Sequence, residues 1–262
     1  MNYSFFYAPG TAGYVRGEQM AEVLGGKKNP TSGFEDDICI YVKVIPENYP
    51  KHSYADVDDS TKLAKWLETH KDIGIIATSE NTKEYLIKKL DREVTVIPHA
   101  HCNYERWTRP DREIKTVGVI GSKTSFQGDT DEFAERLKKI GLDFVYEKEY
   151  WNTYKNNRLK VCEFHKQVDI QVCWRPYMFA REFKNPNKLV NAGSFGIPTI
   201  AYGEEGFKGW YGKFIEVNSI DEMVGKCREL KDKALYKTYS DLAVKKAEEN
   251  HLDNIVKLYK GL

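Results

Sequence analysis

The residues around Lys188 have the composition of an anion-binding site. Residues 185–188 read N-P-N-K, which supplies a helix-capping residue, a proline for the first helical position and a lysine in the first turn. Backbone N–H groups at a helix start attract negative charge, and a nearby ammonium group strengthens the attraction. Because an apolar strand, 170–173, precedes this segment, the anion should lie at the carboxyl edge of a parallel sheet. The sequence therefore predicts a site for a phosphate-bearing ligand, contacted by Lys184, Asn187 and Lys188.

Two further segments could reach the same ligand. Arg175 and Tyr177 follow the strand at the position of a ribose or a base, and a guanidinium group can hold a phosphate through two hydrogen bonds. Gly121, Ser122 and Lys123 follow another apolar strand, and the glycine would let the backbone approach the ligand. Exposed surface cations and a tight strand-to-helix turn explain these residues without a ligand. Both interpretations are open at this stage.

Histidines and a carboxylate near expected strand ends are candidates for a catalytic base. His99 and His101 follow one strand, and residues two apart on an extended segment point in opposite directions. One could face a ligand while the other holds the chain. A structural role for either histidine is the alternative, and a zinc site would need ligands beyond the neighbouring Cys102. The loop expected after a strand at 38–45 adds His52, Asp56 and Asp58, of which we select Asp56 with the two histidines.

The first loop of the chain could contact a second substrate. It follows a strand at Tyr3–Tyr7 and opens a helix near residues 16–24, so it should lie at a sheet edge. A turn that needs glycine is the alternative explanation. The candidate acceptor-binding residues are Gly10, Thr11, Gly13, Tyr14 and Arg16.

Aromatic clusters could stack on sugars or bases, although core packing would explain most of them equally well. Trp151 lies beside Tyr150 and Tyr154, and Trp210 lies beside Tyr211, in segments that we expect to be exposed. The polar segment 101–115 mixes arginines with Trp107 and breaks the strand–helix pattern, so we interpret it as a solvated linker.

Composition narrows the class of protein. The 262 residues are 41% hydrophobic, enough for a core, and carry 40 basic and 39 acidic side chains for a net charge of +1. This balance of charge gives no support to a strongly basic surface that would bind a polyanion such as nucleic acid. The five cysteines show no CxxC spacing and suggest reduced thiols. Since the sequence shows neither a signal peptide nor a membrane-spanning run, we expect a cytoplasmic protein without a membrane span.

Strands and helices alternate twice along the chain. Such alternation predicts an α/β protein with parallel sheets and helices on both faces. Within this pattern, residues 184–198 (KNPNKLVNAGSFGIP) resemble the K-P-x-N-K…A-x-x-x-G-x-P signature of the GT-B glycosyltransferases, with the proline displaced by one position. The glycines of the first loop, the IPHAHCN turn and the VGVIGS segment at 117–122 extend the resemblance over the chain.

The resemblance implies a GT-B fold of two Rossmann-like domains. Residues 1–110 would form an acceptor domain and residues 111–240 a nucleotide-sugar donor domain, with a helix in 241–262 returning to the first domain. The implied activity moves a hexose or pentose from a nucleoside diphosphate sugar, the co-substrate, to a hydroxyl of a glycan, a protein or a hydroxymethylated DNA base. No other cofactor is expected. Many retaining members of the family carry two glutamates eight positions apart in this segment. Here the residue eight positions after Glu182 is Val190, so this chain departs from that pattern.

Breaking the bond to a diphosphate requires that its charge be neutralised, by a metal or by fixed cations and a helix start. We identify neither an Asp-x-Asp motif nor a cluster of His, Asp and Glu at metal-ligand spacing, and therefore expect the metal-independent route, with configuration inverted or retained. Two other functions stay open: a sugar-nucleotide epimerase of the same fold, and a binding protein that has lost its catalytic base.

Overall fold

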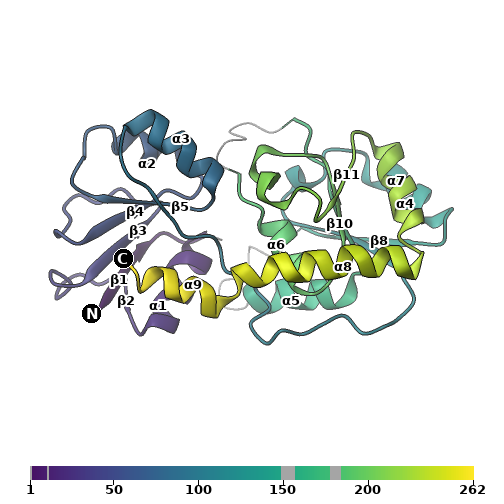
Figure 1. Cartoon of the computed structure of the whole chain (residues 1–262), viewed down its shortest axis with the longest axis horizontal. Coiled ribbons are helices and arrows are strands. Elements are labelled where there is room, and N and C mark those ends of the chain that lie inside the picture. Colours follow the sequence, from purple (N-terminus) through teal and green to yellow (C-terminus); the bar gives the residue numbers. More distant parts are fainter. Residues whose placement is uncertain (1, 11, 149–156, 178–183) are drawn as a thin grey trace. The chain divides into compact units, whose positions relative to one another are not determined.

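Two parallel β-sheets, each with its own helices, organise the chain (Figure 1). The computed structural model describes residues 2–10, 12–148, 157–177 and 184–262. Described residues of 1–100, 180–185 and 252–262 form one compact unit, and those of 101–179 and 186–251 form a second. The expected α/β architecture with parallel sheets is confirmed. The domain limits expected at residues 110 and 240 stay a prediction, and the compact units change at residues 100 and 251.

A parallel sheet forms the centre of the first unit. Its elements are β1 (Tyr3–Tyr7), a π-helical segment (Gly13–Glu18), α1 (Gln19–Leu24), β2 (Lys27–Lys28), β3 (Ile38–Val42), β4 (Ser53–Asp56), α2 (Thr61–Trp66), β5 (Gly74–Ala77), α3 (Glu80–Leu90), β6 (Thr95–Val96) and α9 (Leu252–Tyr259). The strand order is β2-β1-β3-β4-β5-β6. All residues of β3 are buried, as expected for a central strand covered on both faces. Ser60 and Ser79 accept hydrogen bonds from backbone N–H groups at the starts of α2 and α3, which fixes where these helices begin.

The last helix returns to the first unit, as expected. In Figure 1, α9 (yellow) lies beside α1. Its Tyr259 is fully buried and packs on Phe5 of β1 with ring centres 5.8 Å apart. The Tyr3 hydroxyl donates to the carbonyl oxygen of Tyr259 over 3.2 Å. Helix α9, at the end of the sequence, therefore packs against β1, near its beginning, in the core of the first unit.

A second parallel sheet forms the centre of the other unit. Its elements are β7 (Thr116–Ile120), α4 (Thr130–Lys138), β8 (Asp143–Glu147), α5 (Asn157–Gln167), β9 (Ile170–Cys173), α6 (Asn187–Ser194), β10 (Thr199–Ala201), β11 (Ile215–Glu216), α7 (Ile220–Glu229) and α8 (Lys233–Ala247), with 3-10 turns at Lys123–Ser125, Glu205–Trp210 and Glu248–Asn250. The strand order is β11-β10-β9-β7-β8. A Cβ on Gly193 of α6 would lie 3.0 Å from the Ala243 carbonyl oxygen of α8, so this glycine lets the two helices pack closely.

The sequence-based assignment missed strand β4. We expected His52, Asp56 and Asp58 to lie in a loop after the strand at 38–45, but Ser53–Asp56 pairs with β3 and β5. This strand has no apolar run, because Ser53 and Asp56 are both polar, yet both are buried. Neighbouring strands, and not its own hydrophobic pattern, select its conformation. His52 consequently precedes β4 at the amino edge of the sheet, away from Asp56 at the carboxyl end.

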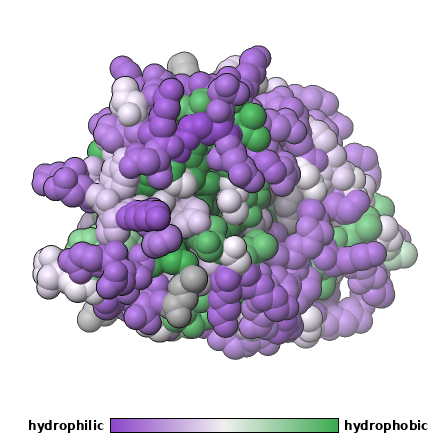
Figure 2. All heavy atoms as spheres, turned by 60° about the vertical axis from the view of Figure 1, so that its left-hand side comes forward, coloured by the Kyte–Doolittle hydropathy of each residue, from purple (hydrophilic) through white to green (hydrophobic). Residues whose placement is uncertain are grey.

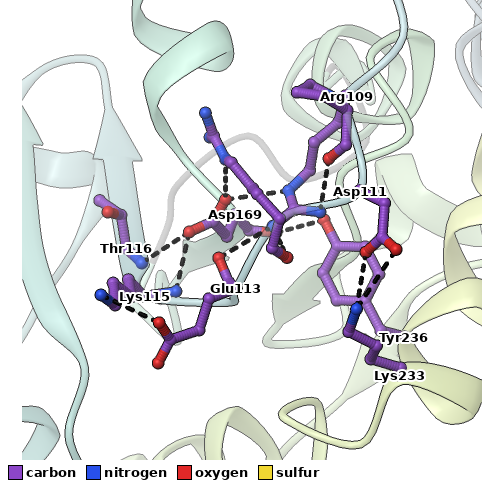
Figure 3. Close-up of polar contacts among 10 residues, drawn as sticks. Arg109, Asp111, Glu113, Lys115, Thr116, Asp169, Lys233 and Tyr236 are labelled. Atoms are coloured by element: carbon purple, nitrogen blue, oxygen red, sulfur yellow. Dashed lines mark hydrogen bonds and ion pairs between the residues drawn. The ribbon is translucent and has the colours of Figure 1, made fainter.

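The segment expected to be a solvated linker is anchored through two of its arginines, Arg109 and Arg112, whereas Arg106 is 52% exposed. Asp169 Oδ1 accepts hydrogen bonds of 2.9 Å from both Arg109 Nε and Arg112 Nε. The same carboxylate accepts the backbone N–H groups of Lys115 and Thr116 over 2.8 and 2.9 Å. Figure 3 shows Arg109, Lys115 and Thr116 converging on Asp169. The segment is thus held against the start of β7.

Hydrophilic residues cover most of the face drawn in Figure 2, with hydrophobic residues between them. No helix in the described ranges is long and apolar enough to cross a membrane. All five cysteines are buried and unpaired with one another. Trp210 is only 3% exposed, which corrects our expectation of an exposed cluster, whereas Tyr211 is 47% exposed. Tyr150, Trp151 and Tyr154 lie outside the described residues.

Candidate functional site

In the first unit, the strand order predicts a ligand crevice at the carboxyl ends of β1 and β3. Strand β2 pairs with one side of β1, and the chain then crosses to add β3 on the other side. Open parallel sheets bind ligands at the point where the direction of strand addition reverses in this way. Lys43 follows β3, and Asp58 follows β4. Both have left-handed backbones, with φ of 57° and 45°. Such strain concentrates at functional sites, where the surrounding structure holds it in place.

Asp58 and His99 form a buried pair at this edge. Asp58 Oδ1 lies 2.8 Å from His99 Nε2, and the two side chains are 5% and 4% exposed. Asn185 Nδ2 donates to the same carboxylate oxygen over 3.1 Å. Burial alone would raise the pKa of Asp58, but His99, followed by Arg16 and Lys43, holds this pKa well below its ordinary value. The ionised carboxylate can orient the imidazole ring and stabilise positive charge on it, as a general base requires.

Asp56, which we selected from the sequence as catalytic, contacts Arg16 instead of a histidine. Arg16 Nε donates to Asp56 Oδ2 over 2.7 Å, and the side chains are 1% and 0% exposed. Burial opposes the charge of Arg16, yet Asp56 and Tyr259 keep its pKa above the ordinary value. The structure therefore closes both residues into an internal ion pair. The sequence analysis named Asp58 as a candidate but did not select it. Asp58 comes just after β4, and that strand had not been recognised, so its place at the strand end was not apparent.

Partly exposed charges border the Asp58–His99 pair. Lys43 Nζ pairs with Asp59 and lies 3.8 Å from Asp58 Oδ2. Lys184 Nζ lies 3.7 Å from Asp59 Oδ2. The side chains of Lys43, Asp59 and Lys184 are 36%, 32% and 24% exposed. This rim offers both hydrogen-bond donors and acceptors, a mixture that suits hydroxyl groups.

The first loop has a structural reason for its glycines. Gly10 has φ of 139°, and a Cβ there would meet no atom within 4 Å. A Cβ on Gly13 would lie 2.0 Å from the Ala8 carbonyl oxygen, so Gly13 allows the π-helical segment to pack on the end of β1. Tyr14 is buried, and Thr11 lies outside the described residues. Acceptor binding by this loop stays a prediction.

His101 does not share the surroundings of His99. It belongs to the second unit, where its ring centre lies 5.2 Å from that of His251. Burial, and then the neighbouring His251, lower the pKa of His101 to about 4. A neutral, enclosed imidazole of this kind suits a structural role.

In the second unit, the order of strands reverses between β7 and β9, which predicts the ligand crevice at their carboxyl ends. Gly121 follows β7 with φ of 127°, a backbone conformation that favours glycine. A Cβ there would lie 2.6 Å from Lys188 Nζ and 2.4 Å from Ser125 Oγ. The ammonium group of Lys188 donates to the carbonyl oxygen of Ile120. Gly121 thus leaves the space through which Lys188 reaches the end of β7.

The electrostatics of Lys188 suit an anion. Burial lowers the pKa of this lysine to about 8; nearby Cys173 and Glu204 oppose the lowering, and Arg175 adds to it. Helix α6 begins at Asn187, one residue later than expected, and its N-cap residue is Pro186, whose side chain makes no capping hydrogen bond. The expected cap, Asn185, contacts Asp58 instead. A partly desolvated cation in the first turn of a helix would gain most from a bound phosphate.

Arg175 has a carboxylate partner that the sequence analysis missed. Its Nε and Nη2 atoms donate to Glu204 Oε1 and Oε2 over 2.7 and 2.6 Å. The two side chains are 11% and 3% exposed. Glu204 follows β10 at the same edge of the sheet, and a glutamate just after a buried strand was the available signal.

The remaining donor candidates lie in different places. Ser122 and the exposed Lys123 follow Gly121 at the edge of the second sheet, and Tyr177 after β9 is 79% exposed. Lys184 belongs to the first unit, so the two lysines of the expected phosphate clamp belong to different units. Whether they act together stays a prediction.

Our statement that the sequence has no Asp-x-Asp motif is wrong, because residues 56–58 and 129–131 both have this pattern. Asp56 and Asp58 bind Arg16 and His99. Asp129 Oδ1 caps α4 by accepting the N–H groups of Asp131 and Glu132 over 2.9 and 3.0 Å. Within the described ranges, no three His, Cys, Asp or Glu side chains are grouped as metal ligands.

Known structures share the architecture of this chain. The crystal structure of TarM matches 87% of this chain and 54% of its own, with a TM-score of 0.59 and 15% identity. A variant of S. aureus TarM in complex with fondaparinux, α-GlcNAc-glycerol and UDP matches 87% and 55%, with a TM-score of 0.60 and 15% identity. AviGT4, a glycosyltransferase involved in avilamycin A biosynthesis, matches 100% and 99%, with a TM-score of 0.47 and 10% identity.

This chain spans about half the length of the TarM chains that it matches. No protein-family model and no curated protein matches it. At such low identity, the likeness to TarM shows a common fold.

Proposed function

We propose that this chain, which has the GT-B glycosyltransferase fold, is itself a glycosyltransferase. It would move a sugar from a nucleoside diphosphate sugar to an acceptor hydroxyl. The observation that carries the proposal is the arrangement of Gly121 and Lys188 at the point where the second sheet reverses its strand order.

The donor half of the proposal follows from charge. As the bond to the sugar breaks, negative charge grows on the leaving diphosphate. Lys188 would donate to a phosphate oxygen in place of the Ile120 carbonyl, with the start of α6 supplying further N–H donors. UDP is the first donor nucleotide to test, because the TarM complex contains it.

The acceptor half rests on the Asp58–His99 pair. His99 would take the proton of the acceptor hydroxyl as its oxygen attacks the sugar, and Asp58 would stabilise the imidazolium that forms. This route inverts configuration at the sugar. The partly exposed rim of Lys43, Asp59 and Lys184 supports a polyhydroxylated acceptor such as a glycan, the class to which the sugar ligand of the TarM complex belongs. A protein or hydroxymethylated DNA acceptor remains for the same assay to test.

The direct test measures binding and turnover of a panel of nucleoside diphosphate sugars. Lys188→Ala should lower kcat/KM for the donor by about a hundredfold, the usual effect of removing one donor to a developing anion. Lys245→Ala is the matched control, because Lys245 is an exposed lysine on α8. If every donor fails to bind, or binds Lys188→Ala unchanged, the proposal is wrong. Epimerised donor without transfer would identify the epimerase, and binding without turnover would identify a binding protein.

The same assay tests whether a metal takes part. Since fixed cations would neutralise the diphosphate, we expect turnover to persist after treatment with EDTA. Loss of activity with EDTA, and its recovery with Mg²⁺ or Mn²⁺, would contradict the metal-independent route.

A further inference from the structure

Gln171 is a polar residue in the middle strand of the second sheet. Strand β9, which contains it, pairs with β7 and β10, and all of its residues are buried. Middle strands of parallel sheets are normally apolar along their length. Burying a side-chain amide costs free energy unless its N–H and C=O groups find partners. The position of Gln171 therefore calls for an explanation beyond core packing.

The amide of Gln171 binds the residue on which the proposed donor site depends. Gln171 Nε2 donates to the backbone carbonyl oxygen of Lys188 over 2.9 Å and to Thr199 Oγ1 over 3.2 Å. Since a carbonyl oxygen can only accept, the contact with Lys188 fixes which way the amide points. Gln171 Oε1 consequently faces His165 Nε2, 3.1 Å away.

His165 of α5 encloses this amide. The ring is fully buried and stacks on Phe195, directly after α6, with ring centres 5.3 Å apart. Burial lowers the pKa of His165 to about 4, so the ring is neutral near pH 7 and carries one N–H. Its Nδ1 lies 2.7 Å from the Val161 carbonyl oxygen, so both ring nitrogens face oxygen atoms and only one of them can donate. The Lys188 carbonyl, and not His165, therefore sets the orientation of Gln171.

Lys188 is thus held at two points. Gln171 binds its backbone carbonyl, and its ammonium group donates to the carbonyl oxygen of Ile120. The N-cap residue Pro186 makes no side-chain hydrogen bond to the start of α6. A phosphate that attracts the ammonium group would take it from Ile120, whereas the bond from Gln171 would remain. Gln171 would then keep the first turn of α6 in place while the charge moves to the ligand.

We infer that Gln171 is a positioning residue that holds Lys188 in reach of the donor diphosphate from within the sheet. This inference rests on the proposed function and adds to it a residue that does not touch the donor. A cation that is already ordered binds an anion without the entropic cost of ordering it at that moment. Losing the bond from Gln171 should therefore weaken donor binding through the charge of Lys188.

The test is calorimetric binding of the glucose esters of uridine, guanosine, adenosine and thymidine diphosphate to the full chain, at pH 7 and pH 9. Gln171→Met keeps the length of the side chain and loses its hydrogen bonds. It should weaken binding of the tightest of these probes by about tenfold at pH 7, the scale of one lost hydrogen bond. At pH 9 the loss should be about twofold or less, because Lys188, with a pKa of about 8, has then lost most of its charge in the parent too.

Tyr236→Phe is the matched control, because it removes another buried hydrogen bond of the same unit, from the Tyr236 hydroxyl to the Asp169 carbonyl oxygen over 2.8 Å. It should lower the unfolding temperature and leave the affinity for the probe unchanged. Thermal unfolding of Gln171→Met, and of Gln171→Leu as a second apolar variant, checks that the fold persists. Unfolding of both variants would show that the amide serves the fold itself, which overturns the inference.

The two pH values separate positioning from a merely structural role. If a folded Gln171→Met binds the probe as tightly as the parent, or loses the same affinity at pH 7 and pH 9, the inference is wrong while the donor site stands. If the parent binds none of the probes, or if Lys188→Ala binds them unchanged, the proposed function itself fails.

Discussion

At the scale of single residues, burial gives ordinary side chains unusual properties. Lys188 is the clearest example, because desolvation brings its pKa to about 8, close to neutral pH. Asp58 shows the opposite result: the positive groups around it outweigh burial and keep it ionised. Both side chains stand at the carboxyl edge of their sheet, where a substrate charge or proton would meet them.

Donor binding should weaken as the pH rises. Lys188 is protonated below its pKa of about 8 and loses its charge above it, so the affinity for a nucleoside diphosphate sugar should fall between pH 7 and pH 9. Isothermal titration across this range measures the effect. A diphosphate sugar is the correct probe, because a terminal phosphate itself titrates at about pH 6. Lys188→Arg should remove the dependence, since a guanidinium group stays protonated, and an identical slope in that variant would contradict the assignment.

Asp58 is expected to support catalysis more than binding. Asp58→Asn removes the charge that stabilises an imidazolium on His99, so kcat should fall by about a hundredfold or more, the scale of general base catalysis. Steady-state kinetics with a saturating donor measure this change. Asp241→Asn is the matched control, because Asp241 and its partner Lys237 on α8 are 64% and 74% exposed and belong to neither proposed site. Equal kcat values for the two variants would remove Asp58 from the proposed mechanism.

At the scale of secondary-structure elements, the ends of strands and helices decide which side chains meet. Strand β4 puts Asp56 and Asp58 at the same edge as Lys43, although the sequence suggested a loop. The start of α6 at Asn187 places Lys188 in the first turn. The segment before β7 is likewise fixed by the single carboxylate of Asp169.

Removing that carboxylate should destabilise the second unit. Asp169→Ala leaves Arg109, whose side chain is 6% exposed, without its ion-pair partner, and breaking a buried pair typically costs about 3–5 kcal/mol. The free energy of unfolding, from denaturant titration, measures the loss. Asp111→Ala is the control, because Asp111 and Lys233, also drawn in Figure 3, are 82% and 70% exposed. A loss no larger than that of the control would show that Asp169 does not anchor the segment.

At the scale of the whole molecule, two sheets of the same type each present a polar cluster at the carboxyl edge. The first cluster offers a carboxylate–imidazole pair, and the second offers a lysine beside a glycine turn. The last helix belongs to the first unit, where Tyr259 packs on the ring of Phe5 and interacts electrostatically with Arg16. In our proposal, the first sheet supplies the group that removes the proton, and the second sheet supplies the group that binds the diphosphate.

The sequence by itself determined the class of fold. The alternation of apolar strands and helices specified parallel sheets, because local periodicity and buried strands are properties of short segments. The segment 184–198 also pointed to the correct fold, and the candidates Gly121 and Lys188 are indeed neighbours.

Only the tertiary structure decided how the polar side chains are paired. Asp56 and Asp58 are two residues apart, yet one binds Arg16 and the other His99. Likewise, His99 and His101 have separate environments, and Glu204 engages Arg175 from the end of another strand. These partners are distant in sequence and meet through sheet order and burial, which set both the contacts and the charges of ionisable groups.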